Sequence, residues 1–174
     1  MYENDFCEYA VAKKKEGAYL AKILLCGAAA LVLAAVSVLL VFSKGIVGMI
    51  PLAALGALVW YLSRYLEIEY EYSLSGEYMD FAAIYSKQYR KELLSVELKK
   101  SARRVMPYNG KIEGFNVAKL YDFRSSASVE HAYVLVFEEN ECEKAVVFDA
   151  TKKLVENMFR QVPSLVVRSN GLPE

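Results

Sequence analysis

Residues 23–42 read ILLCGAAALVLAAVSVLLVF, and the uncharged run that they begin continues to Ser43. Lys44 interrupts it, and a second uncharged run, GIVGMIPLAALGALVWYLS, covers residues 45–63. A helix needs about 20 apolar residues to cross the roughly 30 Å core of a bilayer. The two runs therefore predict an antiparallel hairpin of two transmembrane helices over residues 23–65. A buried hairpin in a soluble bundle is the alternative, but soluble helices normally show a polar stripe that these runs lack.

The position of a proline and the spacing of small residues refine this hairpin. Pro51 is tolerated in a first turn but kinks a helix interior, so the second helix should begin or bend near Ile50 or Pro51. Residues 43–49 would then be a tight connection. Small residues recur at four-residue spacing at Cys26, Ala30 and Ala34, and again at Ala53 and Ala57. Such rows let helix backbones approach closely, either within the hairpin or in a dimer.

The charges that flank the runs predict their orientation. Before the first run stand Lys13, Lys14, Lys15 and Lys22, and after the second stands Arg64, whereas the connecting turn has only Lys44. Basic flanks stay in the cytoplasm, so both termini are predicted to be cytoplasmic and the protein to cross the cell membrane twice. Residues 1–22 would form a cytoplasmic segment, with residues 10–22 extending the first helix. The predicted membrane-interface aromatics are Trp60, Tyr61 and Tyr65.

Residues 66–174 are predicted to form a cytoplasmic domain that consists mainly of strands. Residues 68–74 (IEYEYSL) alternate apolar and polar side chains, which is typical of a half-buried strand, and Ser75-Gly76 is a turn signal. Further strands are predicted over residues 77–87, 88–99, 114–123, 132–138 and 144–149. Residues 99–105 fit either a helix or a strand.

One amphipathic helix is predicted after the last strand. Thr151 is a plausible N-cap for residues 152–161, and Pro163 ends that helix. The fold class is thus a membrane α-helical hairpin plus a mainly β, α+β cytoplasmic domain. Hairpins of strands followed by a late helix predict a bent sheet or barrel of about seven strands, plugged by the helix.

One long segment resembles a known family. Residues 70–98 (YEYSLSGEYMDFAAIYSKQYRKELLSVEL) follow a membrane hairpin and run strand, turn, strand, basic segment and apolar strand, and residues 145–159 give a final strand and helix. This order resembles Firmicute-type bacterial membrane proteins with two N-terminal transmembrane helices and a pleckstrin-homology-like (PH-like) domain. The resemblance implies a PH-like bent sheet or barrel with a C-terminal helix, and a membrane location. It implies little about activity.

Composition and motifs exclude several classes of function. The 174 residues carry 21 basic and 21 acidic side chains, which argues against disorder and against nucleic-acid binding through bulk charge. No nucleotide-binding, zinc-protease or hydrolase motif occurs, so we expect no enzyme, no cofactor and no metal site. The lone His131 is expected to be an ordinary loop residue. The three cysteines, Cys7, Cys26 and Cys142, have no paired spacing.

One segment of the sequence is unusually basic, and Tyr85 and Tyr89 are interleaved with its cations. Its cations are Lys87, Arg90, Lys91, Lys99, Lys100, Arg103 and Arg104. Beneath a membrane they predict contact with anionic lipid, and the alternative is a solvated face that only reinforces topology. We therefore expect a membrane-anchored, non-enzymatic binding module that contacts anionic lipid or a protein partner at the cytoplasmic face. The alternative is a structural or assembly subunit that acts through helix packing and sheet-edge pairing, with a protein partner or as a homo-oligomer.

Overall fold

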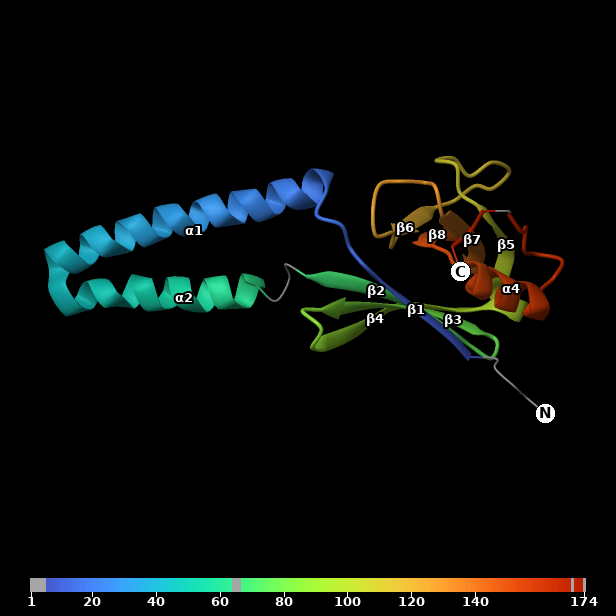
Figure 1. Cartoon of the computed structure of the whole chain (residues 1–174), viewed down its shortest axis with the longest axis horizontal. Helices are drawn as coiled ribbons and strands as arrows, with labels where there is room; N and C mark the ends of the chain where they lie inside the picture. The colour runs from blue at the N-terminus through green and yellow to red at the C-terminus, as the bar shows by residue number, and fades with distance from the viewer. Residues whose placement is uncertain (1–5, 64–66, 170, 174) are drawn as a thin grey trace.

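The computed structural model describes residues 6–63, 67–169 and 171–173, and within them two sheets stand beside a long helical hairpin (Figure 1). Each sheet has four strands, and the hairpin projects from one end of the first sheet. Arg64 and Tyr65, to which the sequence assigned topology and interface roles, lie outside the described residues. The same holds for the side chains of Lys22 and Tyr61.

The first sheet has the strand order β1-β2-β3-β4, all antiparallel. Its strands are β1 (Phe6–Ala12), β2 (Ile68–Ser75), β3 (Tyr78–Tyr85) and β4 (Tyr89–Glu97). Tyr70, Tyr72 and Leu74 on β2 point into the core, as their alternation with polar residues predicts. The predicted strands over residues 68–74, 77–87 and 88–99 are confirmed as β2, β3 and β4.

Strand β1 corrects the prediction for the N-terminal segment. Residues 10–22 were expected to extend the first helix, but residues 10–12 belong to β1 and the helix begins at Gly17. Cys7 is buried and pairs with Leu74, while Ala12 pairs with Glu69, so β1 completes the sheet that residues 66–174 begin. The seven-residue strand was missed because its partner strand lies beyond the whole hairpin in the sequence.

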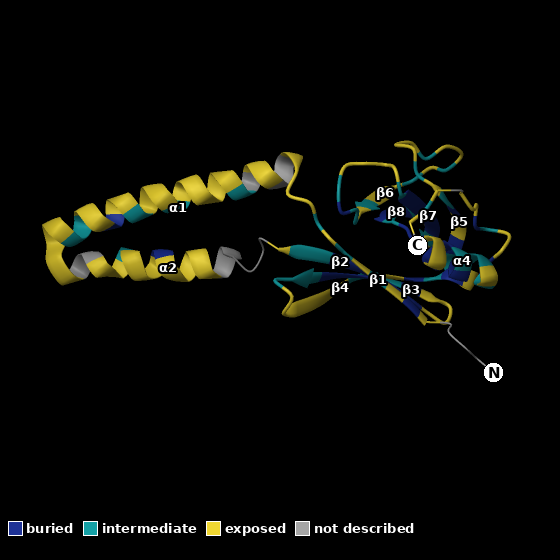
Figure 2. Ribbon diagram, viewed as in Figure 1, coloured by how far each residue is buried: buried dark blue, intermediate teal, exposed yellow. Residues whose placement is uncertain are grey.

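The hairpin consists of α1 (Gly17–Lys44), a 3₁₀ turn η1 (Gly45–Gly48) and α2 (Met49–Ser63). The predicted connection over residues 43–49 is thus nearly correct. Within the described residues, one helix, Ile23–Lys44, is long and apolar enough to cross a membrane, while the apolar segment Met49–Trp60 is shorter. Most hairpin side chains are exposed (Figure 2).

The buried residues of the hairpin lie between its two helices. Ser37 and Leu55 are buried there, and Ala30 and Ala34 are partly buried, so α1 presents its own small residues to α2. The other small residues of the two rows, Cys26, Ala53 and Ala57, are exposed. Of the two uses that the sequence allowed, packing within the hairpin therefore accounts for Ala30 and Ala34.

The second sheet has the order β5-β7-β8-β6, with β6 parallel to β8. Its strands are β5 (Ala102–Pro107), β6 (Lys119–Asp122), β7 (Ala132–Glu139) and β8 (Cys142–Asp149), and a short helix α3 (Leu98–Ser101) precedes β5. Residues 99–105 thus contain both helix and strand. The strand predicted over residues 114–123 is shorter than expected, because Phe115 and Val117 instead pack on the outer face of the second sheet.

One continuous core lies between the two sheets and α4 (Lys152–Gln161). Tyr72, Phe81 and Phe148 meet there at ring-centroid distances of 5.5–5.9 Å. The Thr151 hydroxyl accepts a hydrogen bond from the Leu154 amide at 3.3 Å, which confirms the predicted N-cap. The sheets are not closed into a barrel, so of the predicted alternatives the open bent arrangement is correct.

Candidate functional site: the basic root of the hairpin

The two ends of the hairpin are bonded into the first sheet, and we call this region the root: residues 13–16, Glu67 and the β3–β4 turn 86–88. The Lys13 amide donates to the Ile68 carbonyl at 2.8 Å, and the Ser86 amide donates to the Glu67 carbonyl at 2.8 Å. The Lys14 amide donates to the Ser125 carbonyl at 2.7 Å, which joins the root to the β6–β7 loop. The segment that leads from β1 into α1, and the residue that precedes β2, are therefore both bonded to the domain.

The root is rich in lysine. Lys14, Lys15 and Lys87 are exposed, and Lys13 is partly buried with its ammonium donating to the Tyr70 hydroxyl at 3.1 Å. Lys87 stands in the β3–β4 turn with φ +55°, beside the start of the hairpin. A hollow of about 250 Å³ lies among these cations, and its lining residues are Ala12, Lys13, Lys15, Glu67, Ile68, Glu69 and Lys87.

A second hollow, of about 390 Å³, lies on the other side of the root. Its lining residues are Lys13, Lys14, Glu16, Gly17, Asp122, Arg124, Ser125, Ser126 and Ala127. Arg124 is already engaged there: it donates to both Asp122 oxygens at 2.9 and 2.6 Å and to the carbonyls of Ala127 and Ser128 at 3.3 Å. Arg124 therefore shapes the loop, and the lysines are the cations this hollow offers to a ligand.

The contact with Arg124 lowers the pKa of Asp122. Burial pushes the pKa of the Asp122 carboxyl upward, but the hydrogen bonds from Arg124 outweigh burial and leave the pKa below its ordinary value. The same bonds raise the pKa of Arg124. The ion pair between Arg124 and Asp122 therefore persists at neutral pH. It holds the loop whose Ser125 carbonyl accepts a hydrogen bond from the Lys14 amide.

The structure separates the seven cations that the sequence grouped together. Lys87, Arg90 and Lys91 lie at the root end of the first sheet, because residue 85 pairs with residue 89 beside the hairpin. The other four follow the opposite end of β4, namely Lys99, Lys100, Arg103 and Arg104. Eight strand residues at about 3.3 Å each put the two groups about 26 Å apart.

Several of these cations are also neutralised by carboxylates. Arg90 donates to Glu71 at 2.5 Å, Lys99 to Glu77 at 2.5 Å, and Arg103 forms an ion pair with Glu138. Two more cations, Lys100 and Arg104, are exposed. The seven cations therefore do not form one contiguous surface, and their contact with lipid stays a prediction.

The sequence analysis used Lys13, Lys14 and Lys15 to orient the hairpin and did not group them with Lys87. They reach the same rim as Lys87 because β1 pairs with β2 and thereby brings residue 12 beside residue 69. A prediction of β1 as a strand would have revealed this. Tyr85 and Tyr89 stack near the same rim at a centroid distance of 6.3 Å, and Trp60 is 60% exposed on α2.

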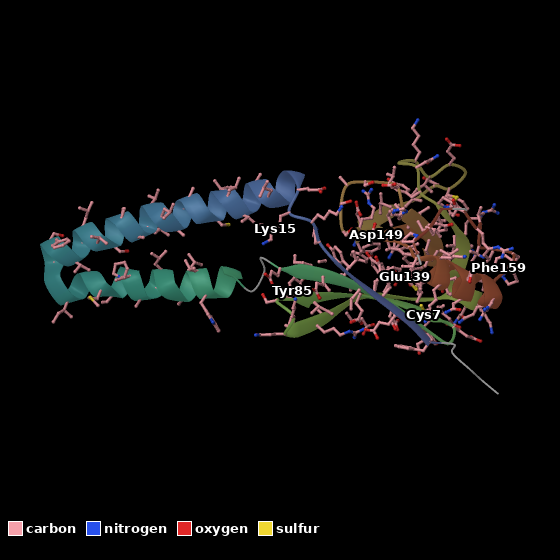
Figure 3. The ribbon with its side chains drawn as sticks, viewed as in Figure 1. Cys7, Lys15, Tyr85, Glu139, Asp149 and Phe159 are labelled. Carbon is pink, nitrogen blue, oxygen red and sulfur yellow. The ribbon has the colours of Figure 1, made fainter. Side chains whose placement is uncertain are left out.

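The remaining candidate residues are His131 and the three cysteines. Within the described part of the chain no three His, Cys, Asp or Glu side chains are grouped to hold a metal ion. His131 lines a hollow of about 210 Å³ together with Tyr9, Asp149 and three serines, and its Nδ1 is buried with no hydrogen-bond partner. Cys7 is buried, whereas Cys26 and Cys142 are exposed (Figure 3 labels Cys7).

The domain thus consists of two four-stranded sheets around one core with a helix after the last strand, and the hairpin stands between its first two strands. The family model for a Bacterial PH-like domain (DUF6106) matches residues 3–168, and the chain belongs to this family. The match covers β1, the hairpin and both sheets as one unit. Searches of curated proteins and of solved structures found no match.

Proposed function

We propose that the protein is a membrane-anchored, non-enzymatic binding module whose root lies against anionic lipid headgroups at the cytoplasmic face. The observation that carries the proposal is the insertion of the apolar hairpin between neighbouring strands, with Lys13, Lys14, Lys15 and Lys87 gathered where it leaves the sheet. The family assignment supports a binding module in general terms.

Strand pairing supports a hairpin that returns to the side from which it started. β1 and β2 are hydrogen-bonded along residues 6–12 and 69–75, so both ends of the hairpin belong to one sheet. Paired strands cannot lie on opposite sides of a bilayer. If α1 crosses the membrane, the chain over residues 45–67 must therefore cross back, although α2 alone spans only about 22 Å at 1.5 Å per residue.

Helix geometry places the root at the depth of the headgroups. The apolar segment begins at Ile23, and Gly17 lies six residues earlier, about 9 Å outside the apolar core. The headgroup region on each side is about 5–8 Å thick, so residues 13–16 would lie at its outer boundary. This is within about one Debye length of the lipid charges, whereas Lys100 and Arg104 would lie more than three Debye lengths away.

The charge of the root gives the expected strength of the contact. Each Lys or Arg near an anionic leaflet contributes about 1 kcal/mol. Lys14, Lys15 and Lys87 together would then favour the docked orientation by about 3 kcal/mol, before Glu16 and Glu67 reduce it. Anchoring through the hairpin makes such a weak contact sufficient, because the domain is never far from the bilayer.

Hydrogen exchange on the full-length chain tests the proposal. The protein is reconstituted into nanodiscs of phosphatidylcholine with or without phosphatidylglycerol, at low and high salt. We expect amides in residues 13–16 and 86–91 to exchange more slowly in the anionic discs, and salt to remove this protection. The Lys15→Glu/Lys87→Glu variant should lose it.

A distal variant, Lys100→Glu/Arg104→Glu, carries the same change in charge and serves as the matched control. It should keep the protection of the root, because its substitutions lie about 26 Å away along the sheet. Equal protection in neutral and anionic discs would contradict headgroup contact, and so would equal losses in the two variants.

A further inference from the structure

The first sheet has one face that the domain does not use for its core. The second sheet and α4 lie on the other side of the sheet (Figure 1). Side chains alternate along each strand, so Cys7, Tyr72 and Phe81 point inward and their neighbours point outward. We call this outward surface the outer face.

The outer face is strongly acidic. Its carboxylates are Glu8, Glu69, Glu71, Asp80, Glu92 and Glu97. Among the described residues its one cation is Arg90, which is bonded to the buried Glu71, and six carboxylates against one guanidinium leave a net charge of −5. No two of these six carboxylates are paired directly across strands, so the face carries its negative charge without opposed like charges, and that charge is complementary to a cationic partner.

Aromatic and small side chains on the same face point to a protein partner. Phe6 and Tyr78 are 55% and 50% exposed, and both pair with Ser75, so they flank it in one row at the end far from the hairpin. Ala10 and Ala82 both pair with Glu71, two rows from Ser75, and of the two Ala10 is exposed whereas Ala82 is buried. Exposed aromatics are enriched at protein interfaces, and their rings attract Lys and Arg.

We propose that the outer face binds a Lys/Arg-rich segment of another membrane protein, close to where that segment emerges from the bilayer. This inference rests on the proposed membrane anchoring, which holds the outer face beside the membrane. Cytoplasmic segments within about 15–20 residues of a transmembrane helix carry an excess of Lys and Arg, so they are the cationic chains that this face would meet.

Charge complementarity also distinguishes this partner from lipid. The outer face runs from the root to the far end of the sheet, over about 25 Å of strand. An anionic bilayer repels carboxylates, so lipid contact belongs to the root and the cationic segment to the outer face. A basic amphipathic segment could set its Lys and Arg on the carboxylates and its apolar side chains on the exposed Ala10, Phe6 and Tyr78.

A peptide-binding measurement tests this with the full-length chain in phosphatidylcholine nanodiscs, where anionic lipid does not compete. The probe is a fluorescent synthetic peptide of Lys and Leu, and the same peptide with Gln in place of every Lys is the control ligand. We expect salt-sensitive binding of the Lys peptide only. The Glu8→Gln/Asp80→Asn/Glu92→Gln variant should bind about tenfold or more weakly.

The matched control variant is Glu113→Gln/Glu130→Gln/Glu141→Gln, which removes three exposed carboxylates outside the outer face. It should change the affinity by less than about twofold. Equal weakening by both variants would overturn the proposal, because overall charge would then explain binding, and so would the absence of binding. A photocrosslinker at Ala10 in native membranes should capture a Lys/Arg-rich peptide adjoining an apolar span, while a neutral or acidic peptide, or this chain itself, would contradict it.

These experiments can reject either proposal without rejecting the other. The outer-face variant keeps Lys15 and Lys87, so its root should retain protection in anionic discs. The Lys15→Glu/Lys87→Glu variant keeps the carboxylates and should still bind the Lys peptide. Loss of lipid protection with intact peptide binding would reject only headgroup contact, and the reverse would reject only the outer face.

Discussion

At the scale of single residues, the ion pair between Asp122 and Arg124 organises the loop beside the root. Arg124 holds Asp122 on one side and the carbonyls of Ala127 and Ser128 on the other. The loop so formed presents the Ser125 carbonyl to the Lys14 amide, and the Ser125 amide donates to Asp149 at 2.6 Å. One guanidinium thus connects the second sheet to the start of the hairpin.

The Asp122→Asn variant should lower thermal stability in a way that depends on pH. The folded state depresses the pKa of Asp122, so this carboxylate stabilises the fold above its unfolded pKa of about 3.9 and loses that effect as pH falls through the lower folded value. Because the side chain is 49% exposed, the effect at pH 7 should not exceed about 1 kcal/mol. Circular dichroism melts of the full chain in non-ionic detergent, from pH 3 to pH 8, measure it. A difference from wild type that stays constant over this range would contradict the mechanism.

Residues with local signals were predictable, and those with distant partners were not. Thr151 was identified as an N-cap because its role depends only on the next three residues. The sequence grouped Lys87 with Lys99 because they are near in the chain, yet an intervening strand carries them to opposite ends of the sheet. The Lys14 amide donates to the Ser125 carbonyl, in a loop more than 100 residues away in the sequence, and no local pattern indicates such a contact.

At the scale of elements, strong periodicity located most strands and the long helix. β2, β3, β7 and β8 have apolar alternation or β-branched runs that are bounded by turn residues, and all were predicted. β1 and β6 are short, and each is fixed by a neighbour far along the sequence, β2 and β8 respectively. A single stretch of seven or four residues carries too little pattern to show such pairing.

The cap of α4 gives an element-scale prediction. The Thr151→Ala variant removes the side-chain oxygen that accepts the Leu154 amide, which should cost about 1 kcal/mol and lower the melting temperature by roughly 4 °C. The Thr151→Ser variant keeps the acceptor and serves as the control. Calorimetry of the full chain in detergent compares the three proteins. Equal losses in both variants would assign the effect to packing of the threonine methyl group rather than to the cap.

At the scale of the whole molecule, the hairpin restricts how copies of the chain could assemble. Within the described residues β4 pairs only with β3, so its outer edge could accept another strand. Antiparallel pairing of two β4 edges by a two-fold axis would point the two hairpins in opposite directions. If the hairpins of both copies are anchored in one membrane, this symmetric β4–β4 pairing is excluded.

The same connectivity predicts which residues face which side of the membrane. The native Cys142, on the exposed β7–β8 turn, and a Lys15→Cys substitution at the root should react with an impermeant maleimide from the same side, because β1 and β2 belong to one folded domain. An Ile46→Cys substitution in η1 should react from the opposite side if α1 crosses. Each reporter is placed in a Cys26→Ala background that keeps the buried Cys7, and Cys142 is also replaced by Ala where residue 15 or 46 is the reporter. The variants are labelled in intact and permeabilised bacterial cells. Labelling of residue 46 from the same side as Cys142 would mean that the hairpin enters the bilayer without crossing it, and the root lysines would then meet the headgroups at a different angle.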